Sequence, residues 1–169
     1  MTRPAVVCDA GPLIALAGCG QLDLLVAVFE AVHVPQAILD ETSADQSRPG
    51  ASSIAAFVRA HAKVHPRRGD AIYTAAAAHL DEGEAQALSL AHALGCGVLM
   101  DERRGRQAAL RQGLPLFGVL GVLLQARRIG QIDRIAPALQ RMQANGYRIA
   151  RALADEALKL AGEAGQIVI

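Results

Sequence analysis

Residues 5–14 of the chain read AVVCDAGPLI, a short apolar run that ends at an acidic residue and leads into a helical stretch. Residues 5–8 are apolar and include two β-branched valines, a pattern typical of a buried strand. Asp9 ends this strand, and Gly11 and Pro12 open a helix that continues to Ala17. A buried strand that passes directly into a helix predicts a parallel sheet, and Asp9 marks the carboxyl end of its first strand.

The same unit recurs along the chain. Further short apolar strands are expected at 31–34, 97–100 and 114–119, and helices at 22–29, 35–41, 54–62, 81–94, 103–111 and 120–128. Residues 42–50 and 66–70 are polar and contain proline and glycine, so they are expected to be loops. Strands that alternate with helices in this way predict an α/β fold, in which helices cover both faces of a parallel sheet.

Two amphipathic helices are expected after this core. Apolar residues recur at helical spacing from Ile132 to Met142 and again from Ile149 to Leu160, with Gly146 between the two runs. With no internal repeat and no long linker, the chain is expected to form a single domain over 1–169. In this domain, 5–128 form the core and 129–165 the C-terminal helices.

The composition is that of a globular protein without a strong charge bias. Of 169 residues, 52% are hydrophobic and 20% charged, which excludes a disordered chain. The net charge of +1 argues against binding of nucleic acid by bulk electrostatics. It does not exclude a nuclease, because the charges of a basic groove and a neighbouring acidic site cancel in the sum. Three widely spaced cysteines fit neither a zinc site nor a disulfide framework, and indicate buried thiols in a reducing compartment.

The N-terminal region does not support a membrane location. Residues 16–19, LAGC, are similar to the end of a lipoprotein signal, but Asp9 and the Gly11-Pro12 pair interrupt the preceding apolar stretch. The most apolar later stretch, 114–126, is shorter than the ~20 residues that a membrane span requires. We therefore expect a cytoplasmic protein that does not contact the membrane.

Four carboxylates are the candidate functional groups. Asp9 and Asp101 each end a predicted strand, and ligands of parallel sheets bind beyond the carboxyl ends of the strands. In the helix at 35–41, Glu41 shares the apolar face, whereas Asp40 points elsewhere. In the helix that follows Asp81, the apolar face includes Glu84, while Glu82 is expected to be solvated.

Each acid also has a purely structural interpretation. Asp9 could bond turn amides, Asp81 and Glu84 fit a capping box, and Asp101 could complement the dipole of the next helix. Four inward or strand-end acids in one small domain would repel one another unless a cation neutralised them. Clustered carboxylate oxygens without His or Cys indicate Mg²⁺ or Mn²⁺ rather than zinc.

The order of these acids resembles that of PIN domains. Four segments carry the resemblance: 7–14 (VCDAGPLI), 34–41 (VPQAILDE), 81–88 (DEGEAQAL) and 99–106 (LMDERRGR). It covers about residues 5–128, and the C-terminal helices are similar to those of an uncharacterised bacterial and archaeal PIN subfamily.

The resemblance implies a three-layer α/β/α PIN-like fold with a metal-dependent ribonuclease site. By motif match it assigns both metal binding and catalysis, with Mg²⁺ or Mn²⁺ as cofactor, to Asp9, Glu41, Glu84 and Asp101. Many small bacterial PIN proteins are VapC-type toxins, usually dimeric and neutralised by a small antitoxin, so RNA, an antitoxin and a second copy are the expected partners. The sequence departs from the family at Glu102, where a second aspartate is common, and at Gly118-Val119, where many members carry Ser or Thr.

Substrate binding and assembly yield further expectations. Arg103, Arg104 and Arg106 follow the fourth acid and are candidates to bind the RNA backbone, or else form a solvated helix face. The apolar stripe over 132–160 is expected to form a homodimer interface, unless both helices pack on the sheet of a monomer.

Two other functions remain open. One is a PIN-like module that binds RNA or protein without cutting, which the missing hydroxyl near Val119 would favour. The other is a small α/β phosphatase with Asp9 as nucleophile, although Gly11 stands where such enzymes usually have a second acid.

Overall fold

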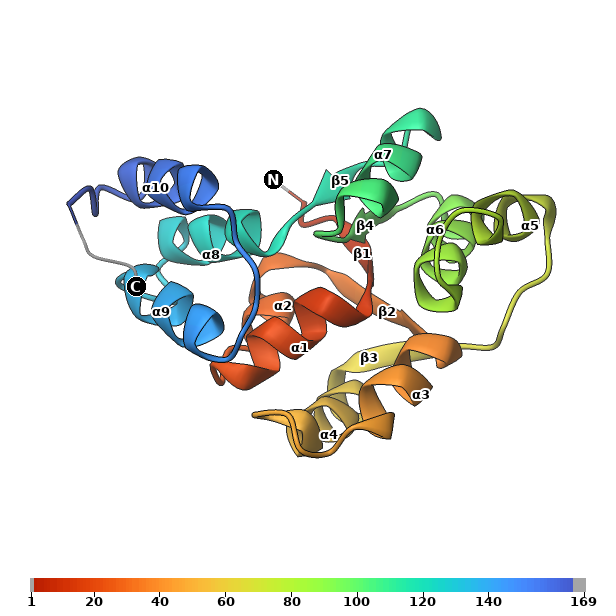
Figure 1. Cartoon of the computed structure of the whole chain (residues 1–169), viewed down its shortest axis with the longest axis horizontal. Coiled ribbons are helices and arrows are strands. Elements are labelled where there is room, and N and C mark those ends of the chain that lie inside the picture. The colour runs from red at the N-terminus through yellow and green to blue at the C-terminus, as the bar shows by residue number, and fades with distance from the viewer. Residues whose placement is uncertain (1, 166–169) are drawn as a thin grey trace.

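A computed structural model describes residues 2–165 and contains a five-stranded parallel sheet with helices on both sides (Figure 1). The strands are β1 (Ala5–Cys8), β2 (Ala31–Pro35), β3 (Ala62–His65), β4 (Gly97–Leu99) and β5 (Leu116–Phe117). The helices are α1 (Ala10–Gly18), α2 (Leu24–Val28), α3 (Gln36–Ala44), α4 (Ala51–His61), α5 (Ala71–Ala77), α6 (Glu82–Leu94), α7 (Arg103–Arg111), α8 (Val119–Arg128), α9 (Ala136–Ala144) and α10 (Arg151–Leu160). The predicted three-layer α/β/α fold is confirmed.

The strand order β3-β2-β1-β4-β5 places the first strand at the centre. Val6 and Val7 are fully buried, and β1 pairs in parallel with β2 on one side and with β4 on the other. From β1 the chain moves outward to β3 and then crosses back to β4. Because crossovers between parallel strands are right-handed, this reversal places α1–α4 on one face of the sheet and α5–α7 on the other.

The reversal also defines where a ligand can enter. Connections leave the carboxyl ends of β1 and β4 in opposite directions, which opens a crevice between them. The backbone amide of Asp9 donates to the carbonyl oxygen of Leu99 at 3.0 Å, so the two strand ends lie side by side. The sheet therefore brings the residues that follow β1 and β4 to one place.

Two elements were not predicted from the sequence. Strand β3 is an edge strand whose residues 62–65 are only half-buried or exposed, so it lacks the apolar run that identified the other strands. Helix α5 is short, and only Ala76 of it is buried. The fourth predicted strand, 114–119, is also shorter in the structure, where β5 covers only Leu116–Phe117.

The C-terminal region differs from the expected apolar stripe. Ile135, Leu139 and Met142 are fully buried, so the first half of the stripe belongs to the core of the chain and not to its surface. In α10 the buried residues are Ala154, Ala157 and Leu158, whereas Leu153 and Leu160 are exposed. The leucines at 153 and 160 of the expected stripe therefore lie on the surface, and the buried face of this helix consists mostly of alanine.

The structure shows the surroundings of the three cysteines and the length of each helix. Cys8 and Cys19 are buried and Cys96 is half-buried, and burial raises the pKa of all three thiols. In the part of the chain that the structure describes, no helix is both long and apolar enough to cross a bilayer.

Candidate active site

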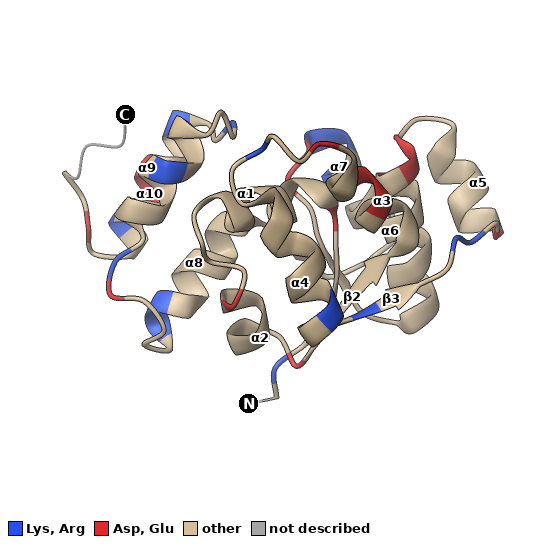
Figure 2. Ribbon diagram, turned by 90° about the horizontal axis from the view of Figure 1, so that it is seen from below, with Lys and Arg blue, Asp and Glu red and all other residues tan. Residues whose placement is uncertain are grey.

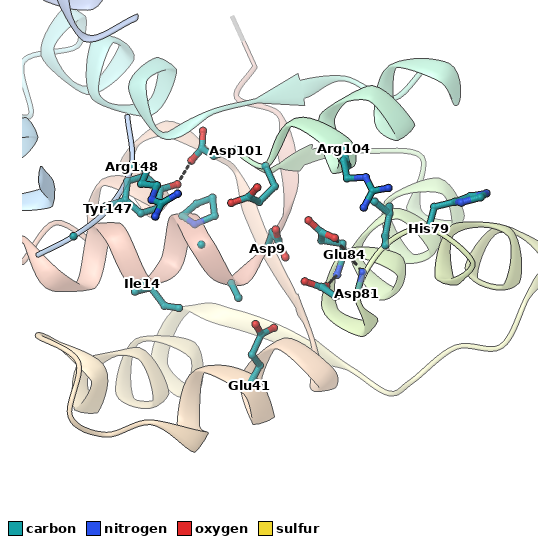
Figure 3. Close-up of a pocket in the computed structure, with 16 residues that line it drawn as sticks. Asp9, Ile14, Glu41, His79, Asp81, Glu84, Asp101, Arg104, Tyr147 and Arg148 are labelled. Carbon is teal, nitrogen blue, oxygen red and sulfur yellow. Dashed lines mark hydrogen bonds between the residues drawn. The ribbon is translucent and has the colours of Figure 1, made fainter. Parts of the chain in front are cut away.

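The crevice above β1 and β4 is an acidic pocket of about 580 Å³. It contains all four carboxylates that the sequence singles out, together with two more acids, Asp81 and Glu102. Its lining residues are Asp9, Ala10, Gly11, Pro12, Ile14, Glu41, His79, Leu80, Asp81, Glu84, Asp101, Glu102, Arg104, Gly146, Tyr147 and Arg148. In Figure 3, Asp9 lies between Glu84 on one side and Asp101 on the other, with Glu41 across the pocket.

Asp9 is the most deeply placed acid of the pocket. It follows β1 directly, occupies the N-cap position of α1 and is only 5% exposed. Burial raises its pKa to about 8, a shift that the backbone amide of Ala10 opposes and the neighbouring carboxylates reinforce. Within residues 2–165, Asp9 forms no ion pair with a basic side chain.

Glu84 comes from the first turn of α6. The capping box suggested by the sequence is present, because the Asp81 side chain accepts from the Glu84 amide at 2.8 Å and the Glu84 side chain accepts from the Asp81 amide at 3.1 Å. Glu84 is nevertheless in the pocket and only 8% exposed, and burial raises its pKa. The structural and the functional interpretation of this residue are therefore compatible.

Glu41 reaches the pocket from α3. Its side chain is exposed, not buried as the predicted inward face implied, because the apolar face of α3 ends at the rim of the pocket. Gly83 leaves room for it, since a Cβ at that position would lie 2.8 Å from Glu41 Oε2. Partial burial raises the pKa of Glu41, with a further contribution from Asp81.

Asp101 is held by two donors. The Tyr147 hydroxyl donates to Oδ2 at 2.5 Å, and the backbone amide of Val119, at the start of α8, donates to Oδ1 at 3.2 Å. Gly118 makes this approach possible, because a Cβ there would lie 2.9 Å from Oδ1. Asp101 therefore has a fixed orientation at one edge of the pocket (Figure 3).

The donor set fits a hard divalent cation. The four acids offer only carboxylate oxygens, the ligands that Mg²⁺ and Mn²⁺ prefer, and Gly83 and Gly118 leave the space in which two of these carboxylates lie. Among residues 2–165, no three His, Cys, Asp or Glu side chains are already arranged to hold a metal ion. The fit of a cation therefore rests on the type of donor and on the cavity that the four carboxylates share.

The predicted RNA-binding arginines lie in three different environments. Arg104 is exposed and lines the pocket, whereas Arg103 is exposed and is not among the lining residues. The guanidinium of Arg106 instead donates to the carbonyl oxygen of Met100 at 2.8 Å, which ties α7 to the end of β4. We therefore correct the assignment of Arg106 to a structural one. Figure 2 shows acidic positions gathered near α3, α6 and the start of α7, with basic positions of α7 beside them.

Two pocket residues escaped the sequence interpretation. Tyr147 and Arg148 lie between α9 and α10, more than forty residues after the fourth acid. Neither belongs to a local motif, and the only hint is that Tyr147 directly follows a glycine that ends a helix. Figure 3 shows Arg148 and Arg104 on opposite sides of the acids.

The family comparison covers nearly the whole chain. A family model described as a PIN domain matches residues 5–163 and thus includes the C-terminal helices as well as the sheet. No curated protein sequence matches the chain.

Proposed function

Because this chain belongs to the PIN-domain family, whose members are generally nucleases, we propose that it is a metal-dependent endoribonuclease that hydrolyses RNA phosphodiesters. The observation that carries the proposal is the pocket above β1 and β4, where four acids from separate elements face one cavity of about 580 Å³. Within residues 2–165, none of these four acids forms an ion pair with an arginine, lysine or histidine.

Asp9, Glu41, Glu84 and Asp101 are the groups that would hold Mg²⁺ or Mn²⁺. A bound divalent ion lowers the pKa of a water ligand and stabilises the negative charge that develops on a phosphate. The protein's own contribution is to hold these carboxylates at one site. The helices α1, α6, α7 and α8 all begin near this site, and their N-termini favour the negative charge there before a cation binds.

The substrate strand is proposed to pass over the pocket between Arg104 and Arg148. Both side chains are exposed, and arginine pairs with phosphate through two parallel hydrogen bonds. On the Arg104 side the pocket continues into a second cavity of about 580 Å³ between α5 and α7, which is lined by His79, Arg104 and Arg111 among others. This basic path suits a phosphate backbone and explains how a nearly neutral chain could bind RNA.

The test is cleavage of a single-stranded RNA of mixed sequence by the purified chain. We expect cleavage with Mg²⁺ or Mn²⁺, none in excess EDTA, and no hydrolysis of a phosphomonoester under the same conditions. Activity that survives EDTA would contradict the metal mechanism, and hydrolysis of the monoester with intact RNA would favour the phosphatase alternative, in which Asp9 is the nucleophile.

A second candidate is a PIN-like module that binds RNA or protein with little catalysis. One observation favours it: the residue after Gly118 is Val119, which has no hydroxyl. RNA that binds in a gel-shift experiment without being cut at saturating Mn²⁺ would support this alternative.

In the cell, we propose that the chain acts as the toxin of a toxin–antitoxin pair. The resemblance of its acid segments to small bacterial PIN toxins supports this role, with a small antitoxin protein as partner and the cytoplasm as location. Production of the chain in bacteria is expected to arrest growth. The Asp9→Asn variant should not arrest growth. Co-production of the antitoxin, expected from a small open reading frame that adjoins the gene, should relieve the arrest.

We also propose a homodimer. Leu153 and Leu160 are 59% and 68% exposed on α10, and a second copy could cover them. Size-exclusion chromatography with light scattering should give twice the 17.7 kDa of one chain, and a concentration-independent mass of 17.7 kDa would rule the dimer out.

A further inference from the structure

The segment between α9 and α10 forms one wall of the active-site pocket. It lies beside α1, where the Asn145 side chain donates to the carbonyl oxygen of Gly18 at 3.1 Å (Figure 1). Gly146 has a φ of +87°, a conformation that favours glycine, and this turn places Tyr147 over the first turn of α1. A residue far from the four acid motifs in sequence is thus brought into the site.

The Tyr147 hydroxyl forms a hydrogen bond with the carboxylate of Asp101. The hydroxyl donates to Oδ2 of this carboxylate at 2.5 Å. Tyr147 is half-buried in the wall of the pocket. Its hydroxyl is the donor of this pair, because a carboxylate oxygen accepts.

The two donors to Asp101 come from the first turn of α8 and from the loop that follows α9. Val119 belongs to the first turn of α8, and Tyr147 follows α9, which packs against α1. Together they hold a side chain that would otherwise rotate freely, so less ordering is left to a cation that binds there. Hydrogen bonds of this kind orient metal ligands and are typically worth ~10–100-fold in metal affinity.

We propose that Tyr147 is a positioning residue that presents Asp101 to the divalent cation. This inference rests on the proposed function, because it requires that the four acids bind a metal. It makes the C-terminal segment part of the active site.

The experiment compares Mn²⁺ binding by isothermal titration calorimetry in the full chain and in two tyrosine variants. Tyr147→Phe removes the hydroxyl and keeps the ring, and we expect Mn²⁺ binding to weaken by roughly 10-fold. Tyr73→Phe is the matched control, since Tyr73 also donates to a carboxylate at 2.5 Å, that of Glu82, which is outside the pocket. Its affinity for Mn²⁺ should equal that of the unaltered chain.

A second measurement separates positioning from a purely structural role. RNA cleavage by Tyr147→Phe should be reduced at low Mn²⁺ and return to the unaltered level in excess Mn²⁺, while the melting temperature of the metal-free variant stays close to that of the original chain. Equal Mn²⁺ affinity in Tyr147→Phe overturns the inference and leaves the proposed function intact. Tighter binding also overturns it, because the hydroxyl would then compete with the metal for Asp101. If the unaltered chain binds no Mn²⁺, the metal mechanism and this inference both fall.

Discussion

Asp40 and Glu41 are consecutive residues of α3, yet they belong to two different electrostatic regions. Asp40 accepts hydrogen bonds from Gln36 and Arg67, which lower its pKa, whereas burial in the pocket raises the pKa of Glu41. The same division appears on α6. Glu82 lies near Arg67 and accepts from the Tyr73 hydroxyl, and Glu84, two residues later, faces the pocket.

We call these two sets the paired acids (Asp40, Asp70 and Glu82) and the pocket acids (Asp9, Glu41, Glu84 and Asp101). Each paired acid has an arginine within 4.0 Å and lies on the outer side of α3 and α6 or in the loop beside them. Among the pocket acids, burial raises the pKa of three, and the seven ion pairs found within residues 2–165 include none of the four. The paired acids therefore form direct ion pairs with arginine, whereas the pocket acids, where a cation is proposed to bind, form none within the described residues.

The strongest test of this division is the loss of cleavage when one acid of each set becomes an amide. Asp9→Asn is expected to reduce RNA cleavage by at least ~100-fold, because a bound metal contributes several kcal/mol to catalysis. Asp40→Asn should stay within about 2-fold, since a surface ion pair contributes ~0–1 kcal/mol to stability and nothing to the site. Initial rates at saturating Mn²⁺ measure both, and equal losses would erase the distinction between the two sets.

The α6 pair gives a sharper but smaller contrast. Glu84→Gln keeps the capping box, because glutamine also serves at that position, and removes only the charge from the pocket. We expect cleavage to fall by roughly 10-fold or more, as is typical when an interaction at a metal site is lost. Glu82→Gln should cleave almost normally. If both variants lost activity equally, the assignment of the two helix faces would be wrong.

In the metal-free protein, the substitution of Asp9 that reduces cleavage should instead increase the stability of the fold. Since the pKa of Asp9 rises to about 8 in the folded state, protonated Asp9 favours folding, and this contribution is lost as the pH rises from about 4 through 8. Asp9→Asn should therefore melt roughly 5 °C higher than the original chain at pH 8 without metal, and this gain should shrink towards pH 5. Asp40→Asn should show no such gain at pH 8, because hydrogen bonds lower the pKa of the Asp40 carboxyl in the folded chain. Thermal denaturation at several pH values in EDTA measures both melting temperatures. Equal melting temperatures of the two variants at pH 8 would contradict this expectation.

The sequence predicted the pocket acids better than it predicted their environment. Asp9 and Asp101 could be placed because each ends a buried apolar strand, and a parallel sheet aligns such ends. Glu41 and Glu84 could be assigned to helix faces because helical periodicity is local. In contrast, the partner of Asp101 is Tyr147, which reaches it only through the path of the chain after α9.

The incorrect predictions have the same cause. Arg106 was grouped with Arg103 and Arg104 because three arginines of one helix look alike in sequence. Its side chain instead contacts the end of β4, whose position the sequence of the helix does not reveal. Strand β3 was missed because an edge strand needs little apolar surface. Each of these features is set by tertiary neighbours, not by local pattern.

The smallest expected effect concerns the positive side of the pocket. Arg103 and Arg104 are adjacent and both exposed, but only Arg104 lines the acidic pocket and the α5–α7 cavity. Arg104→Gln is expected to raise the KM for RNA by about 5-fold and to reduce the salt dependence of binding by one phosphate contact, uniformly across RNA sequences. The turnover number should hardly change, because the arginine contacts the backbone away from the bond that is cut. Arg103→Gln should leave KM unaltered, and steady-state kinetics at two salt concentrations distinguish the variants. A loss in Arg103→Gln equal to that in Arg104→Gln would mean that RNA responds to the overall charge of α7, and the proposed path between α5 and α7 would have to be abandoned.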